Sequence, residues 1–227
     1  MSSPDRGPLE NWITGDTFSC LAAKAAVRRK TLKRVALGTM GNAATTAELH
    51  TAVTEFVARD LSPTENFASL VVTFEGPHGI DEEAFEALLW QQLNALHDLD
   101  VARGHAWAQG VESDPESPHF AFSVAGHPFF VVGMHADASR ISRRYPQPAL
   151  AFNSHHQFDR LKRSGVYYGL QRRIREREER LQQSINPNLA EFGDASEARQ
   201  YSGSTTDAGW RCPFHPRPRT TGAGSPH

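Results

Sequence analysis

Histidine, arginine and asparagine side chains gather between residues 127 and 160, close to the ends of apolar segments. His135 follows one apolar run directly, and His155 follows the next run, with Asn153 two residues before it. If these runs are neighbouring strands whose ends meet, the two imidazoles converge. Imidazole suits Fe, Zn, Cu and Ni, and a haem iron needs only one or two axial ligands from the protein. Histidines hydrogen-bonded at strand ends would give the same pattern, so the residues alone leave the kind of site open.

Three arginines follow His135 closely. Arg140, Arg143 and Arg144 are spaced three and four residues apart, which in a helix places them on adjacent parts of one face. Guanidinium groups bind carboxylates and phosphates through paired hydrogen bonds, so haem propionates or a substrate carboxylate would be natural partners. A solvated basic face is the alternative interpretation.

Two carboxylates are suited to holding a cationic guanidinium. Glu197 lies in the irregular segment 184–203, and Glu75 ends an apolar run. Arg199, in the same segment as Glu197, is a further candidate for contact with an anionic cofactor group. Helix capping or a salt bridge between Glu197 and Arg199 explains these residues equally well.

The string RCPFHP near the end of the chain contains Cys212 and His215. A thiolate is a known haem ligand, whereas a lone cysteine beside Pro and Phe is more often a small buried apolar residue. His215 is either a ligand or an ordinary tail histidine. The second cysteine, Cys20, is far away in sequence, so neither a paired-cysteine metal motif nor a disulfide framework is expected, and a cytoplasmic location is the default.

The segments that must position these residues alternate between strand and helix patterns. The pair 119–124 and 128–134 flanks Ala125 and Gly126 and predicts an antiparallel hairpin. The fold class is therefore α/β or α+β, with a mixed sheet packed with helices. Strands are predicted at 33–38, 67–74, 119–124, 128–134 and 149–152, and helices at 45–58, 81–96, 138–145, 155–163 and 167–183, the second of these with Asp81 as N-cap.

Composition limits the function classes. The 24 basic and 26 acidic residues give a net charge of −2, which provides no overall reason to expect a nucleic-acid or membrane binder. Apolar runs of signal or membrane-spanning length are absent from the sequence. The phosphate-loop, dinucleotide-binding, zincin, nucleophile-elbow and CxxC motifs are absent too, which argues against nucleotide hydrolysis and simple flavin or nicotinamide chemistry.

We expect a flexible N-terminus at 1–10, one catalytic domain at 11–201, a docked C-terminal segment at 202–216 and a flexible tail at 217–227. The docked segment is predicted because Trp210, Cys212, Phe214 and their neighbours form an apolar cluster within a Gly-, Ser- and Pro-rich stretch.

Several strings together resemble the YqcI/YcgG-like family, and the resemblance runs from about residue 12 to 215. They are FSCLAAKAA, LLWQQLNALHDLD, HFAFSVAGHPFFVVGMHADASRISRRYP, PALAFNSHHQFDRLKRSGVYYGL, IREREERLQQSINPNLAEFGDASEARQYSG and WRCPFH. The family includes haem-dependent enzymes resembling the arginine N-hydroxylase of D-cycloserine biosynthesis and the pre-guanitoxin N-hydroxylase. The resemblance therefore implies haem binding and insertion of oxygen into a guanidine nitrogen.

The resemblance also carries residues over. It places His135 in a GMH element, His155 in an Asn-x-His element, and Cys212 with His215 in the closing CPFH element. His135 is the leading candidate for the axial haem ligand, with the other three as competitors. The sequence departs from the family strings at Ala136 and Ser154, where proline is expected, and these changes affect the geometry of the loops more than the chemistry of a ligand.

The expected function is haem-dependent N-hydroxylation of L-arginine or a related guanidino amino acid in specialised metabolism, using O2 or peroxide, with electrons from a reductase partner where O2 is used. One alternative is a haem-binding or gas-sensing module without turnover. Another is a non-haem metal oxygenase using His135, His155 and Asp159. A homodimer contact through an exposed apolar helix face is left open.

Overall fold

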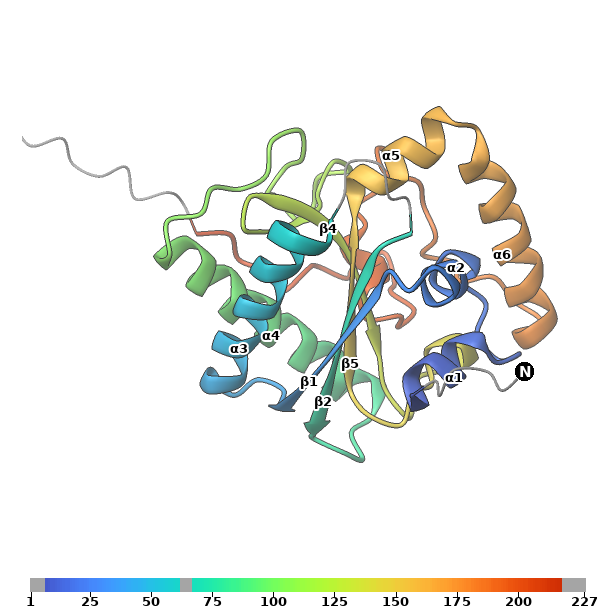
Figure 1. Cartoon of the computed structure of the whole chain (residues 1–227), viewed down its shortest axis with the longest axis horizontal. Coiled ribbons are helices and arrows are strands. Elements are labelled where there is room, and N and C mark those ends of the chain that lie inside the picture. Colours follow the sequence, from blue (N-terminus) through green and yellow to red (C-terminus); the bar gives the residue numbers. More distant parts are fainter. Residues whose placement is uncertain (1–6, 62–66, 218–227) are drawn as a thin grey trace, which may run out of the picture.

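The computed structural model describes residues 7–61 and 67–217 and shows a five-stranded sheet covered by helices on both faces (Figure 1). The strand order is β1-β2-β5-β4-β3, in which β1 and β2 are parallel and the other neighbours antiparallel. The mixed α/β fold predicted from the sequence is thus confirmed. The strands are β1 Leu32–Thr39, β2 Ser69–Gly76, β3 Phe122–Val124, β4 His127–Met134 and β5 Ala149–Ser154. The helices are α1 Pro8–Thr14, α2 Leu21–Arg29, α3 Ala43–Glu55, α4 Glu82–Ala102, α5 His155–Arg163, α6 Val166–Gln182 and α7 Ala198–Tyr201.

Helices α3 and α4 cover one face of the sheet, and α1, α2 and α6 lie on the other (Figure 1). Helix α4 begins as the sequence predicts, because the Asp81 carboxylate accepts a hydrogen bond from the Ala84 N–H at 2.8 Å. Its apolar side packs so closely on β4 that a Cβ on Gly133 would lie 2.7 Å from a Leu89 methyl group. The core on this face therefore requires glycine at that position.

The β3–β4 hairpin is also confirmed. Ala125 and Gly126 form its two-residue turn, and both have positive φ angles, 53° and 69°. Two positive φ angles match the twist of the flanking strands in tight hairpins. The predicted strand at 119–124 is shorter than expected, since only Phe122–Val124 pairs with β4.

Two predictions about local structure are wrong. Residues 138–145 do not form a helix but a single 3-10 turn at Ile141–Arg143. Pro146 follows directly and disfavours helical backbone at Tyr145. At the N-terminus, Pro8–Thr14 is a helix whose Leu9 is fully buried, so residues 8–10 belong to the packed structure; residues 1–6 of the predicted flexible segment lie outside the described residues.

The C-terminal segment packs on α4. The Asn94 side chain donates to the Pro213 carbonyl and accepts from the His215 N–H, and Trp210 Nε1 donates to Glu86. Arg217, predicted to begin the flexible tail, pairs with Asp98, and residues 218–227 lie outside the described residues. Among the described residues, no helix combines the length and apolar character needed to cross a membrane.

Candidate functional site

The two leading histidine candidates lie at opposite ends of the sheet, so the predicted convergence of His135 and His155 is wrong. Strands β4 and β5 are antiparallel, with Phe129 opposite Ser154 and Met134 opposite Ala149. His135 follows the end of β4 and His155 follows the end of β5, and at about 3.3 Å per residue these ends are separated by roughly 20 Å. A mononuclear site built from His135, His155 and Asp159 is therefore excluded by topology.

His135 is enclosed beside α4. Its ring stacks on Phe85 with centroids 4.3 Å apart, and both ring nitrogens are buried with no hydrogen-bond partner in the described parts of the chain. Burial lowers the pKa of His135 and keeps the ring neutral. Its side chain does not line the cavity that His155 lines.

His155, in contrast, lines a cavity of about 280 Å³ between the sheet and helices α2, α5 and α6. This volume is close to the lower end of the range of about 300–1,000 Å³ that is usual for ligand sites. The cavity opens to solvent near Asp159 and Leu189, both of which are exposed. Its walls are mainly apolar and aromatic, and include Phe130, Val132, Phe158, Tyr167, Leu170, Ile174 and Phe192.

A buried carboxylate lies directly behind His155. Glu197 Oε2 is 2.8 Å from His155 Nε2, although the ring N–H is not aligned for a regular hydrogen bond. The other carboxylate oxygen, Oε1, makes a short contact with the Tyr201 hydroxyl. Burial raises the pKa of Glu197, and the neighbouring His155 lowers it in part. The Tyr201 hydroxyl is fixed in turn, because it accepts from the Phe122 N–H and lies within hydrogen-bond distance of the Phe129 carbonyl.

These contacts form a His155–Glu197–Tyr201 chain that runs from the cavity wall to the β3–β4 hairpin. Such a chain fixes the orientation of an imidazole, as carboxylates do for histidines that bind metals. Of the alternative explanations for Glu197, the salt bridge with Arg199 is not formed, since Arg199 donates to the carbonyl oxygens of Asp207 and Trp210 and stacks over the Trp210 ring.

Other polar groups in the cavity come from three elements. Asn153, on β5, accepts a hydrogen bond from Ser69 on β2, so the predicted site residue Asn153 does line the cavity. Gln157 on α5 is 5% exposed, and its Oε1 finds no partner in the part of the chain that the structure describes. Lys162 and Arg175 add two cations to the wall. The cavity thus offers a buried acceptor, an imidazole and positive charge.

The three arginines after His135 do not line this cavity. Arg140 pairs with Glu178 at 3.0 Å, and Arg144 donates to the Ala138 carbonyl at 2.7 Å. Arg143 donates to the backbone carbonyls of residues 133, 200 and 201. Their guanidinium groups connect neighbouring segments of the chain to one another. The positive charge at the cavity comes from Lys162 on α5 and Arg175 on α6 instead.

Three remaining candidates also lie away from the cavity. Cys212 is buried in the core on the α4 face, and burial raises the pKa of its thiol to about 12, which disfavours a thiolate ligand. His215 is exposed on the outer side of α4, and its backbone N–H is held by Asn94. Glu75 is exposed near the end of β2 that lies beside His135.

Comparison with known proteins identifies the chain. Residues 9–215 match the YqcI/YcgG family. The chain belongs to the YqcI/YcgG family. It is 32% identical over 197 residues to the uncharacterized protein YcgG of Bacillus subtilis (strain 168), an alignment that covers 82% of this chain and 76% of that protein. No solved structure matches the chain significantly.

Within this YqcI/YcgG chain, sequence reasoning missed Gln157, Lys162, Tyr167 and Arg175 as cavity residues. The helical periodicity of α5 and α6 shows which residues face inward, but it does not distinguish residues that line a cavity from residues that fill a core. One available signal was the run of cations beside aromatic residues around Lys162 and Tyr167, where the Lys162 ammonium lies 5.1 Å from the centre of the Tyr167 ring.

Proposed function

We propose that this chain is a haem-dependent N-hydroxylase acting on the guanidine group of L-arginine or a related amino acid, and that its site is the cavity beside His155. The observation that carries the proposal is the His155 imidazole on the wall of an apolar, aromatic cavity with the buried Glu197 carboxylate 2.8 Å from its Nε2. A histidine that holds a carboxylate on one nitrogen and a metal on the other is a recurring arrangement in metalloproteins. Membership of the YqcI/YcgG family is consistent with this proposal.

The types of side chain around the cavity suit a haem group. His155 would ligate the iron through the ring nitrogen that Glu197 does not hold, and this choice replaces His135 as the leading ligand. The aromatic walls suit a flat macrocycle, while Lys162 and Arg175 would pair with its propionates or with the carboxylate of the substrate. When bound, haem would supply the oxygen activation that N-hydroxylation requires.

The chain's own residues would bind and orient the substrate. Gln157 Oε1 is a buried acceptor without a partner among the described residues, and a guanidinium N–H would satisfy it. Glu197 would act as a positioning residue, since its two oxygens face His155 and Tyr201. Electrons would come from a reductase partner, or peroxide would replace both O2 and electrons.

The test is haemin reconstitution of the full chain, followed by titration with L-arginine and mass spectrometry of the product with peroxide present. We expect a stoichiometric Soret band that shifts with arginine, and a product heavier by one oxygen atom. His155→Ala should abolish the stoichiometric band. The matched control is His156→Ala, which changes the exposed neighbouring histidine on the same helix and should leave the band intact.

Three results would count against the proposal in different ways. If the wild-type protein retains no haem, the cofactor assignment fails. If His155→Ala keeps the band and His135→Ala loses it, the ligand assignment fails. If haem binds but arginine neither shifts the spectrum nor is hydroxylated, the N-hydroxylase assignment fails in favour of a haem-binding module without turnover.

A further inference from the structure

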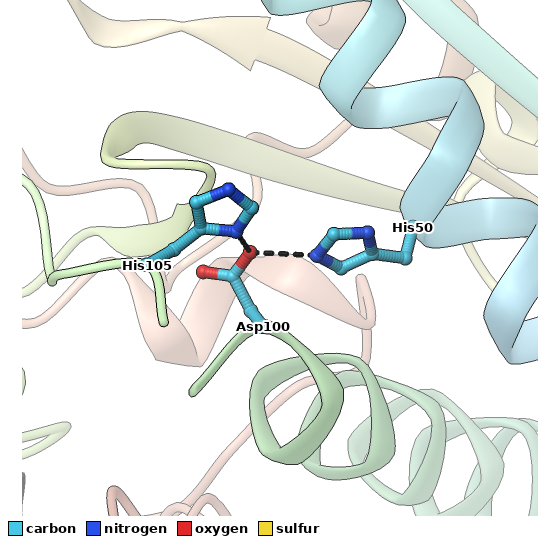
Figure 2. Close-up of side chains that lie close together, drawn as sticks. All are labelled: His50, Asp100 and His105. Carbon is cyan, nitrogen blue, oxygen red and sulfur yellow. Dashed lines mark hydrogen bonds and ion pairs between the residues drawn. The ribbon is translucent and has the colours of Figure 1, made fainter. Parts of the chain in front are cut away.

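A second polar cluster lies on the α3–α4 face of the sheet, away from the cavity. His50 on α3 and His105 in the loop after α4 both face Asp100, which is near the end of α4 (Figure 2). His50 Nε2 is 2.8 Å and His105 Nδ1 is 2.7 Å from the same oxygen, Asp100 Oδ1. The two rings are 5.5 Å apart and nearly parallel.

We propose that His50, Asp100 and His105 form a Zn²⁺ site. One ligand atom from each residue lies within 4.8 Å of the other two. In a tetrahedral site with metal–ligand distances of about 2.0–2.2 Å, ligand atoms lie roughly 3.4 Å apart, so movements of the two imidazoles on the order of 1 Å would make room for the ion. Two imidazoles and a carboxylate are a usual set of protein ligands for zinc, and the His105 side chain, 33% exposed, leaves a route for a water molecule as fourth ligand.

The carboxylate is oriented without the metal. The N–H of Ala125, the first residue of the β3–β4 turn, lies 3.0 Å and 3.1 Å from the two oxygens of Asp100. Outer hydrogen bonds of this kind fix the direction of metal ligands and raise the affinity of the site. A bound zinc ion would therefore join α3, the end of α4 and the loop that follows it.

Arg103 controls the tautomer of His50. Its Nη1 lies 2.6 Å from His50 Nδ1, and since a guanidinium only donates hydrogen bonds, Nδ1 accepts and the ring proton is on Nε2. Zinc at Nε2 requires that proton to be on Nδ1, where Thr54 Oγ1 at 3.4 Å is in place to accept it. Arg103 is an exposed residue at the end of α4, so it is free to turn into solvent. Arg103 and the metal thus compete for His50. When the metal replaces Arg103, the imidazole stays neutral and its proton moves from Nε2 to Nδ1.

The test is titration of tag-free, metal-free, cofactor-free full-length protein with Co²⁺, a spectroscopic substitute for zinc. We expect a tetrahedral d–d absorption at one equivalent that added Zn²⁺ abolishes, and a rise in the unfolding temperature with Zn²⁺. His105→Ala should remove both signals, whereas the control His78→Ala, at an exposed histidine elsewhere, should keep them. Arg103→Ala should bind about 10-fold more tightly or better, within the range of outer-shell effects.

Absence of the cobalt spectrum in the wild-type protein, or its persistence in His105→Ala, would overturn the site and leave the cluster as a hydrogen-bonded connection between elements. Unchanged or weaker binding by Arg103→Ala would overturn the competition between Arg103 and the metal. Since no haem is present in this titration, the outcome is independent of the proposed N-hydroxylase activity.

Discussion

Replacement of Arg143 by Met should destabilise the protein strongly, because its guanidinium joins α7 to β4 through their backbone carbonyls. It donates to the carbonyls of Gln200 at 2.7 Å, Tyr201 at 2.8 Å and Gly133 at 3.2 Å. The Arg143 side chain is half-buried, and burial lowers its pKa to about 10, which leaves it a cation at neutral pH. Gly203, with a φ of +90°, lies against the Arg143 side chain, and a Cβ at this position would lie 2.8 Å from the Arg143 Cδ atom.

The magnitude follows from the three bonds. Each hydrogen bond to a charged donor contributes about 1.5–3 kcal/mol, and a buried carbonyl left without a donor costs about 1–3 kcal/mol. Removing the guanidinium also removes the cost of burying its charge, so the net loss should be less than three full bonds, about 3–5 kcal/mol of unfolding free energy. Arg143→Lys keeps a cation but not the planar fork, and should lose roughly half of this amount.

Urea unfolding followed by circular dichroism measures the loss, from the shift of the midpoint at constant m. The matched control is Arg144→Met, since Arg144 is exposed and its guanidinium donates to the nearby carbonyls of Ala138 and Ser139, with an expected loss under about 1 kcal/mol. Equal losses for the Arg143 and Arg144 variants would refute the structural role given to Arg143. A normal unfolding curve together with weakened haemin binding would restore Arg143 as a contact of the cofactor.

Three further predictions concern the hairpin and the cavity. Burial first, and then the positive charge of His156, lowers the pKa of His127 to about 4, so between pH 6.5 and 4 the unfolded chain binds a proton that the native chain does not. The free energy of unfolding should therefore fall as the pH falls through this window. In a pH series of urea melts, His127→Gln should show a shallower fall than the wild-type protein, and identical slopes would contradict the burial argument. Tyr201→Phe leaves the Phe122 N–H without its acceptor and should lower the free energy of unfolding in urea by about 1–3 kcal/mol. A loss under about 0.5 kcal/mol, which is the scatter of neutral surface changes, would show that water replaces the hydroxyl. Haemin at about 100 times its Kd should stabilise the wild-type protein by about 2.7 kcal/mol in thermal melts and should leave His155→Ala unchanged; equal stabilisation of both would place the haem elsewhere.

The sequence predicts the elements well because local patterns determine them. Alternating apolar residues and the Ala125–Gly126 turn specify the hairpin, and the spacing of Phe85, Leu89, Leu93 and Leu96 specifies α4, all four of which are fully buried. Membership of the YqcI/YcgG family was likewise readable from the printed strings.

Strand order is different, because pairing between distant segments leaves no local pattern. His135 and His155 each follow an apolar strand, and only the antiparallel pairing of β4 with β5 shows that these two strand ends are far apart. The prediction that the three arginines bind an anionic cofactor or substrate group failed for a related reason. The charge and spacing of Arg140, Arg143 and Arg144 indicate that they need anionic or carbonyl partners. Only the fold shows that these partners are backbone carbonyls and Glu178.

Helix α6 shows how burial without close packing points to the cavity. Leu170 and Ile174 recur at helical spacing as an apolar face and line the cavity, and both are only half-buried. The only residue of the helix in the buried class is Glu178, which is 8% exposed and is held by Arg140. An apolar helix face that meets a void forgoes the packing energy a filled core would provide, and a bound apolar group restores it. The same helix also contributes Arg175 to the cavity wall, so the ligand that completes its packing should be apolar over most of its surface and anionic at one edge.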